Sequence, residues 1–187
     1  LLSRFNMEPN KDVAVVVAGA TMERLAGLDS GRIDATVLTP SEIPRAKKQG
    51  FVEIYDMNEL GIEVQGNGFA TSRSFIKGSR ETVKAALKAY VEAIYYIHHN
   101  QQETKKIAGK YMRTNDPDVL EATYTWFVRR VAKKPYPTLK GIQFLLDEVA
   151  GKLPQAKSAR PEQFVDLGLL QELEKEGFFS EMGKRYS

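Results

Sequence analysis

The sequence of 187 residues contains no cysteine, only two histidines and a single tryptophan. Without cysteine, the chain can form neither a disulfide framework nor a thiolate metal or redox site. No apolar run approaches the roughly 20 residues that span a membrane. Neither sign of charge dominates the chain. Its 27 lysines and arginines are interleaved with 24 aspartates and glutamates. This mixed surface argues against nucleic-acid binding, which needs a basic stripe.

The two histidines do not supply a metal site either. His98 and His99 are neighbours in the sequence, so on a helix they point about 100° apart and lack the i, i+4 spacing of a chelating pair. We therefore expect no metal, no cofactor and no catalytic residue. Apolar residues make up 42% of the chain, which is enough to bury a core.

The first 57 residues alternate between two kinds of apolar pattern. Residues 13–18, 35–38 and 52–56 are short β-branched runs, as in parallel strands covered on both faces. Residues 20–28 and 43–47 have helical spacing and lie between these runs. The order predicts a small α/β lobe with a largely parallel sheet.

The remaining residues change character. Residues 58–68 are polar and rich in glycine, which predicts a hinge, and residues 69–72 read as a short strand. From Ser79 onward the pattern is almost wholly helical, with an apolar stripe that includes Val91 and Ile94. Further helices are expected after Asp116-Pro117, around residues 139–152 and over residues 161–176.

Several segments, in this order, resemble the type II periplasmic solute-binding proteins of ABC transporters. The group concerned binds alkanesulfonates, nitrate, taurine and thiamine-pyrimidine precursors. The resemblance lies in residues 18–21, 23–28, 30–35, 48–51, 67–72 and 82–93. It implies an α/β, type II periplasmic-binding-protein fold with two lobes and a hinge. Residues 1–65 would belong to the second, middle lobe without its first strand, residues 66–187 to the mostly helical return of the first lobe, and the N-terminal third would be absent.

The expected ligand contacts follow from this fold, because ligands of doubly wound sheets bind beyond the carboxyl ends of the strands. The loops that meet this condition, and the hinge return, contain Gly19, Ala20, Thr21, Thr39, Ser41, Glu42, Asn67 and Phe69. Glycine lets the backbone approach a ligand, and hydroxyls and amides at a helix start can bind an oxyanion. Simpler roles stay open: Thr21 and Ser41 as helix caps, Glu42 as a partner of the helix dipole, and Phe69 as a core residue.

The resemblance implies a periplasmic, monomeric protein that captures a small polar or anionic solute and delivers it to an ABC permease, without enzymatic chemistry. Two alternatives stay open. One is the effector-sensing domain of a transcriptional regulator, which shares the two-lobe fold. The other is a thiamine-pyrimidine-synthase-like enzyme, which is disfavoured because the family's enzymatic branch uses a cysteine-rich motif that this chain lacks.

Overall fold

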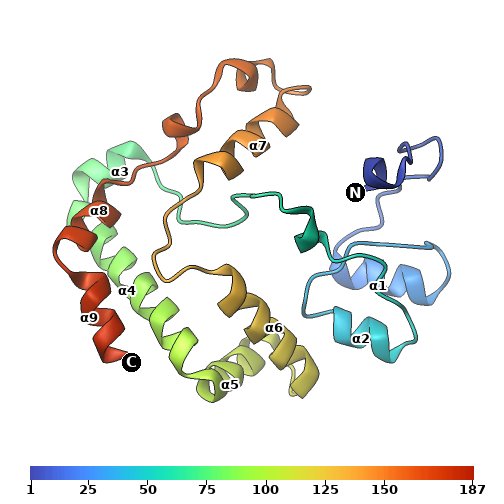
Figure 1. The fold of residues 1–187 in the computed structure, drawn as a ribbon, viewed down its shortest axis with the longest axis horizontal. Helices are drawn as coiled ribbons and strands as arrows, with labels where there is room; N and C mark the ends of the chain where they lie inside the picture. Colours follow the sequence, from blue (N-terminus) through green and yellow to red (C-terminus); the bar gives the residue numbers. More distant parts are fainter. The chain divides into compact units, whose positions relative to one another are not determined.

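The computed structural model describes all residues from Leu1 to Ser187, and its regular secondary structure is almost entirely helical (Figure 1). Helices contain 59% of the residues and strands 1%, and the only β-bridge joins Pro9 to Val13. The α-helices are α1 (Thr21–Asp29), α2 (Ile43–Lys48), α3 (Arg73–Gly78), α4 (Arg80–His99), α5 (Gln101–Met112), α6 (Pro117–Arg130), α7 (Leu139–Val149), α8 (Gly168–Lys175) and α9 (Phe178–Arg185). Four short 3₁₀ helices are η1 (Leu2–Phe5), η2 (Met57–Leu60), η3 (Pro154–Ser158) and η4 (Pro161–Phe164).

The predicted α/β fold, a type II periplasmic-binding-protein fold with two lobes and a hinge, is therefore wrong. Residues 13–18, 35–38 and 52–56 contain no strand, and no ladder of backbone hydrogen bonds joins them. A β-strand exists only when a neighbouring backbone satisfies its N–H and C=O groups. Val17 is 102% exposed and Val52 82% exposed, so the covering layers that the apolar runs predicted are missing too.

The strand predicted at residues 69–72 is also wrong. This segment leads instead into α3, where the Ser72 hydroxyl accepts a hydrogen bond from the Phe75 amide at 3.1 Å. A serine side chain that takes up a first-turn amide favours helix initiation over strand pairing. Residues 69–71 therefore form no regular element, and Ser72 is the N-cap of α3.

The chain divides into two compact units, and each of them is built from two separate stretches of sequence. Unit 1 consists of Leu1–Gly61 and Gln102–Phe127, and unit 2 of Ile62–Gln101 and Val128–Ser187. Unit 1 thus holds α1 and α2 together with nearly all of α5 and most of α6. Unit 2 holds α3, α4 and α7 to α9.

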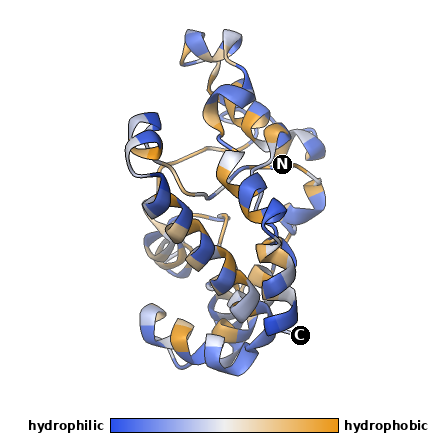
Figure 2. Cartoon of the chain, turned by 90° about the vertical axis from the view of Figure 1, so that its left-hand side faces the viewer, coloured by the Kyte–Doolittle hydropathy of each residue, from blue (hydrophilic) through white to orange (hydrophobic).

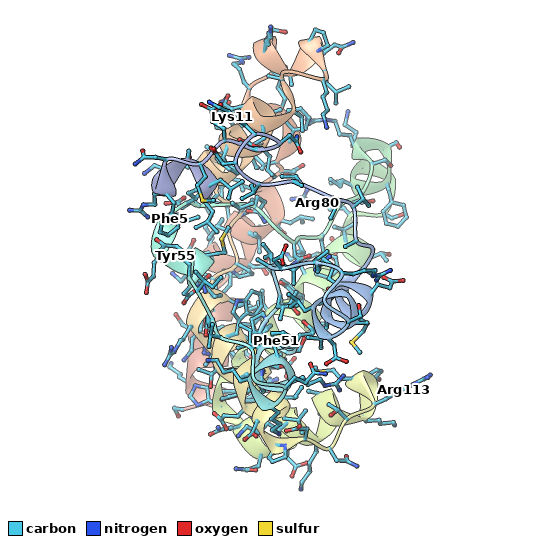
Figure 3. All side chains as sticks on the ribbon, turned by 90° about the vertical axis from the view of Figure 1, so that its right-hand side faces the viewer. Phe5, Lys11, Phe51, Tyr55, Arg80 and Arg113 are labelled. Carbon is cyan, nitrogen blue, oxygen red and sulfur yellow. The ribbon has the colours of Figure 1, made fainter.

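Unit 1 is held together by small contacts between its stretches. The rings of Phe5 and Tyr55 meet edge to face with centroids 5.9 Å apart, and Arg4 Nη1 donates to the Tyr55 hydroxyl at 2.9 Å (Figure 3). Lys48 of α2 binds Asp116, whose Oδ1 also accepts from the amides at the start of α6. The predicted cap at Asp116-Pro117 is confirmed.

The main core of unit 2 lies between α4, α8 and α9, which run side by side in Figure 1. Val91 and Leu173 are completely buried there, and the burial of Ile94 and Val91 confirms the predicted apolar stripe of α4. Figure 2 shows apolar and polar residues sharing these helices, as expected for amphipathic helices that each cover one side of a core. A smaller cluster joins Ile142 and Leu146 of α7 to Ala156.

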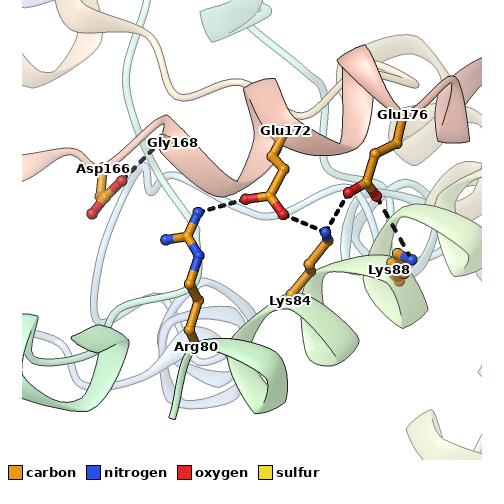
Figure 4. Close-up of polar contacts among 7 residues, drawn as sticks. All are labelled: Arg80, Lys84, Lys88, Asp166, Gly168, Glu172 and Glu176. Atoms are coloured by element: carbon orange, nitrogen blue, oxygen red, sulfur yellow. Dashed lines mark hydrogen bonds and ion pairs between the residues drawn. The ribbon is translucent and has the colours of Figure 1, made fainter. Parts of the chain in front are cut away.

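Ion pairs border this core between α4 and α8 (Figure 4). Glu172 accepts from both Arg80 and Lys84, and Glu176 lies 2.5 Å from Lys84 Nζ. The bonds from Lys84 and then Arg80 hold the pKa of Glu172 below its ordinary value. The single helix predicted over residues 161–176 is wrong, because Asp166 Oδ1 accepts from the Gly168 amide and α8 starts afresh there.

Candidate functional site

The loop before α1 contains three of the predicted ligand contacts, and its geometry requires a glycine. Gly19 has φ +84°, and a Cβ atom there would lie 2.8 Å from Glu23 Oε2. The Glu23 carboxylate reaches back over the first turn and accepts a hydrogen bond from the Ala20 amide. Gly19 therefore permits both the left-handed turn and the close approach of this carboxylate.

Arg24 places a fixed positive charge on the same loop. Its Nη1 donates to the Gly19 carbonyl at 3.1 Å, and its Nη2 donates to the Thr21 hydroxyl at 3.1 Å. The third donor of the guanidinium, Nε, is buried and has no hydrogen-bond partner. Arginine stays protonated at every physiological pH and its planar fork suits oxyanions. The loop thus combines a hydroxyl, backbone amides and a cation with a spare donor.

The sequence analysis named Gly19, Ala20 and Thr21 as ligand contacts, which stay predictions, and it did not name Arg24, which the structure brings against Gly19 and Thr21. The signal was present, because residues three apart on a helix lie on the same side and Arg24 follows Thr21 by three positions. The sequence does not predict the direction of the long, flexible Arg24 side chain, which turns back toward the start of α1.

The loop before α2 forms a second cluster, in which hydroxyl groups surround a carboxylate. The Ser41 hydroxyl donates to Glu42 Oε1 at 2.7 Å, and the Thr39 hydroxyl donates to Glu42 Oε2 and lies 3.1 Å from Ser41 Oγ. Glu42 also occupies the N-cap position of α2, but its side chain makes no capping bond. The three predicted residues of this loop therefore lie together and satisfy one another.

The two loops lie at the same end of unit 1. Arg45 Nη1 lies 3.9 Å from Met22 Sδ near the starts of α1 and α2, while Gln49 Nε2 lies 3.5 Å from Asp29 Oδ1 at their ends. Contacts of start with start and end with end mean that the two helices, neighbours in Figure 1, run in the same direction. The loop with Arg24 and the loop with Glu42 accordingly face the same way.

The last two predicted contacts, Asn67 and Phe69, belong to unit 2. The Asn67 carbonyl accepts from Gln65 Nε2 at 2.7 Å. Phe69 is 65% exposed and meets the ring of Tyr90 edge to face at 4.8 Å, so it is not a core residue. Their roles as ligand contacts stay predictions. Gly19, Ala20, Thr21, Thr39, Ser41 and Glu42 were predicted because ligands bind beyond the carboxyl ends of strands, and that reason does not apply to a chain without a sheet.

Two further observations bear on the chemistry that the chain can perform. No group of three or more histidine, cysteine, aspartate or glutamate side chains is arranged to hold a metal ion. None of the helices combines the length and the hydrophobicity of a transmembrane span.

Comparison with known proteins supports the family resemblance. The family model described as NMT1/THI5 like matches residues 1–104, which is more than half of the 187 residues. The match supports kinship with the type II periplasmic binding proteins, without selecting a subfamily among the ABC importers, and it is compatible with binding of a small solute. Searches of the curated proteins and of the solved structures found no match. The chain belongs to the NMT1/THI5-like family.

Proposed function

We propose that this chain is the solute-binding component of an ABC importer and captures a small polar or anionic solute of the sulfonate, nitrate, taurine or thiamine-precursor type. Family membership supports the solute-binding role. The single observation that carries the choice of ligand chemistry is the guanidinium of Arg24, fixed against Gly19 and Thr21 with Nε buried and unpaired. A buried donor without a partner is costly, and an oxyanion would satisfy it.

The carboxylate of Glu23 already occupies the amide that such an anion would use. It accepts from Ala20 in the structure, as a bound carboxylate or sulfonate oxygen would. In this proposal Glu23 is an internal competitor that the solute displaces. The neighbouring cluster of Thr39, Ser41 and Glu42 faces the same way and supplies an acceptor for a donor group elsewhere on the solute.

No covalent step forms part of the proposal. The chain has no cysteine, and both histidines have structural neighbours at the end of α4: His98 Nε2 lies 3.0 Å from the Val131 carbonyl, and His99 Nε2 lies 3.2 Å from Lys133 Nζ. Burial, followed by the charge of Lys133, lowers the pKa of His99 below its ordinary value. A neutral imidazole that accepts from a lysine is consistent with a packing role.

Calorimetric titration with taurine, nitrate and a hydroxymethyl-aminopyrimidine tests the ligand chemistry. Arg24→Gln should weaken binding of the accepted probe about tenfold or more, because a hydrogen bond to a charged group contributes about 1.5–3 kcal/mol. Arg24→Lys keeps the charge without the fork and should recover only part of the affinity. Glu23→Gln should bind the anionic probes several-fold more tightly, since the competing charge is gone.

Arg32→Gln is the matched control, because Arg32 is an exposed arginine of the same unit. It should leave the affinity unchanged. Wild-type affinity in Arg24→Gln, or the same loss in Arg32→Gln, would show that Arg24 does not bind the solute. Failure of all three probes to bind would reject the proposed solute class.

The importer role adds a location and a partner to the proposal. The protein should be periplasmic, act as a monomer and dock on an ABC permease. Cell fractionation, light scattering and uptake of labelled taurine or nitrate by cells with and without the gene test these points. Unchanged uptake of every probe that binds in vitro would contradict the transport role.

A further inference from the structure

Asn67 is followed directly by Gly68 in the segment of unit 2 that precedes α3, and both residues are exposed. No residue from 61 to 72 belongs to a helix or a strand, so no regular hydrogen bonds hold this stretch. The Asn67 side chain makes no hydrogen bond, and the Gly68 amide donates none. The two groups are therefore free to react with each other.

An asparagine side chain and the peptide nitrogen that follows it can close a five-membered ring. Once hydroxide has removed its proton, the Gly68 nitrogen attacks Asn67 Cγ. A bond between these two atoms forms, the Cγ–Nδ2 bond breaks, and ammonia leaves after taking a proton from water. Water then opens the resulting succinimide at either carbonyl, which yields aspartate or isoaspartate. Glycine hinders this attack least, because it has no Cβ and its backbone rotates freely.

The Gln65 side chain adds a contact that the two-residue motif does not predict. Its Nε2 donates to the Asn67 carbonyl at 2.7 Å. Its Oε1 accepts from the Thr138 amide at the start of α7 at 2.9 Å, which holds the side-chain amide in place. Gln65 therefore fixes a hydrogen-bond donor on the peptide group that contains the attacking nitrogen.

This donor stabilises the reactive form of the peptide group. The Asn67 carbonyl and the Gly68 nitrogen share one resonance system, so the negative charge left by deprotonation of the nitrogen spreads onto the oxygen that Gln65 contacts. A hydrogen bond to a charged acceptor is stronger than one to a neutral carbonyl. The bond from Gln65 consequently favours the anion that carries out the attack.

The other asparagines of the chain lack this arrangement. None of them precedes a glycine; they are Asn6, Asn10, Asn58, Asn100 and Asn115. The side-chain amide of Asn100, moreover, donates to the Tyr96 carbonyl at 3.0 Å. Asn100 therefore serves as the internal reference for a slow asparagine.

We infer that Asn67 is a self-modification site, at which the chain converts its own asparagine into aspartate or isoaspartate, with Gln65 as a positioning residue. The overall reaction consumes water and releases ammonia. Each event replaces a neutral amide by a carboxylate and so lowers the formal net charge of +3 by one, to +2. No solute takes part, so the inference does not depend on the proposed function.

Incubation of the full chain at mildly alkaline pH, followed by proteolysis and mass spectrometry, measures the loss of each asparagine separately. Asn67 should be lost first, and its rate should rise with pH because hydroxide generates the attacking nitrogen. Gly68→Ala should slow the loss severalfold. This variant should fold, because a Cβ at Gly68 would meet only Gln65 Nε2, at an ordinary contact distance of 3.5 Å. Loss of Asn67 no faster than loss of Asn100 would overturn the modification site.

Gln65→Met and Gln65→Lys separate the bond to Asn67 from the contact with α7. Both variants lose the acceptor for the Thr138 amide, but only lysine keeps a donor for the Asn67 carbonyl. Gln65→Met should slow the loss of Asn67 about two- to tenfold, the range that corresponds to one hydrogen bond, and Gln65→Lys should stay near the wild-type rate. In urea the two variants should react equally fast, because the unfolded chain lacks this bond. Equal rates of the two folded variants, or a difference that persists in urea, would overturn the role of Gln65.

Discussion

Gly141 is the third residue of α7, and its neighbours lie so close that one added methyl group should destabilise the protein. A Cβ atom there would lie 2.6 Å from the Gln65 amide nitrogen and 2.6 Å from Thr138 Cγ2. The segment before α3 therefore passes directly over the first turn of α7. Gln65 Oε1 accepts from the Thr138 amide at 2.9 Å, and the Thr138 hydroxyl donates to Glu63 at 2.6 Å and caps α7 through the Gly141 amide.

Gly141→Ala forces these groups apart. Two hydrogen bonds at about 1 kcal/mol each and a helix cap of about 1 kcal/mol are lost, while alanine regains about 1 kcal/mol of helix propensity. The net expectation is a destabilisation of about 2 kcal/mol, or a melting temperature lower by about 4–8 °C for a chain of this size. Urea and thermal unfolding followed by far-UV circular dichroism measure both quantities.

Gly78→Ala provides the matched control. Gly78 also lies in a helix of unit 2, and a Cβ atom there would meet nothing within 4 Å. It should stabilise the chain slightly, by up to about 1 kcal/mol. If Gly141→Ala proved as stable as Gly78→Ala, the docking of the segment over α7 would be refuted.

Leu173→Ala should cost about 2–5 kcal/mol in urea unfolding, because Leu173 is fully buried in the main core; a loss below about 1 kcal/mol would contradict that packing. Burial and then the bond to Glu174 raise the pKa of Tyr136 to about 12. The protonated Tyr136 therefore stabilises the folded state fully below pH 10, and this contribution is lost as the pH rises toward 12. Tyr136→Phe should remove that late phenolate step from absorbance titrations at 295 nm; an unchanged step would assign it elsewhere. Glu172 stabilises the folded state above about pH 4.5, and this contribution is lost at lower pH. In Glu172→Gln the melting temperature should therefore fall less steeply as the pH is lowered. An equally steep fall in the variant would contradict the pairing of Glu172 with Lys84.

The helices could be predicted because their signals are local. The stripe with Val91 and Ile94 recurs at helical spacing, and Asp116 with the following proline marks the start of α6. Both signals act within a few residues and need no distant partner.

The strands could not be predicted in this way, because an extended run says nothing about what it pairs with. In residues 14–18 the only backbone amide that donates a hydrogen bond is that of Val15, which donates to Asn10 Oδ1 at 3.1 Å. Valine and isoleucine favour extended backbone, but hydrogen bonding between strands is a property of two segments. The same limit applies to the site: Gly19 and Thr21 are visible in the sequence, whereas the return of Arg24 onto them depends on side-chain packing.

The interleaving of the two units along the chain sets an order for synthesis. Unit 1 needs both Leu1–Gly61 and Gln102–Phe127, so it cannot be completed until Phe127 has left the ribosome, well after the first residues of unit 2 have emerged. A chain stalled at Gly61 would contain α1 and α2 but neither of the carboxylates that hold Lys48. Until the start of α6 is made, Lys48 lacks both of these partners and unit 1 is incomplete.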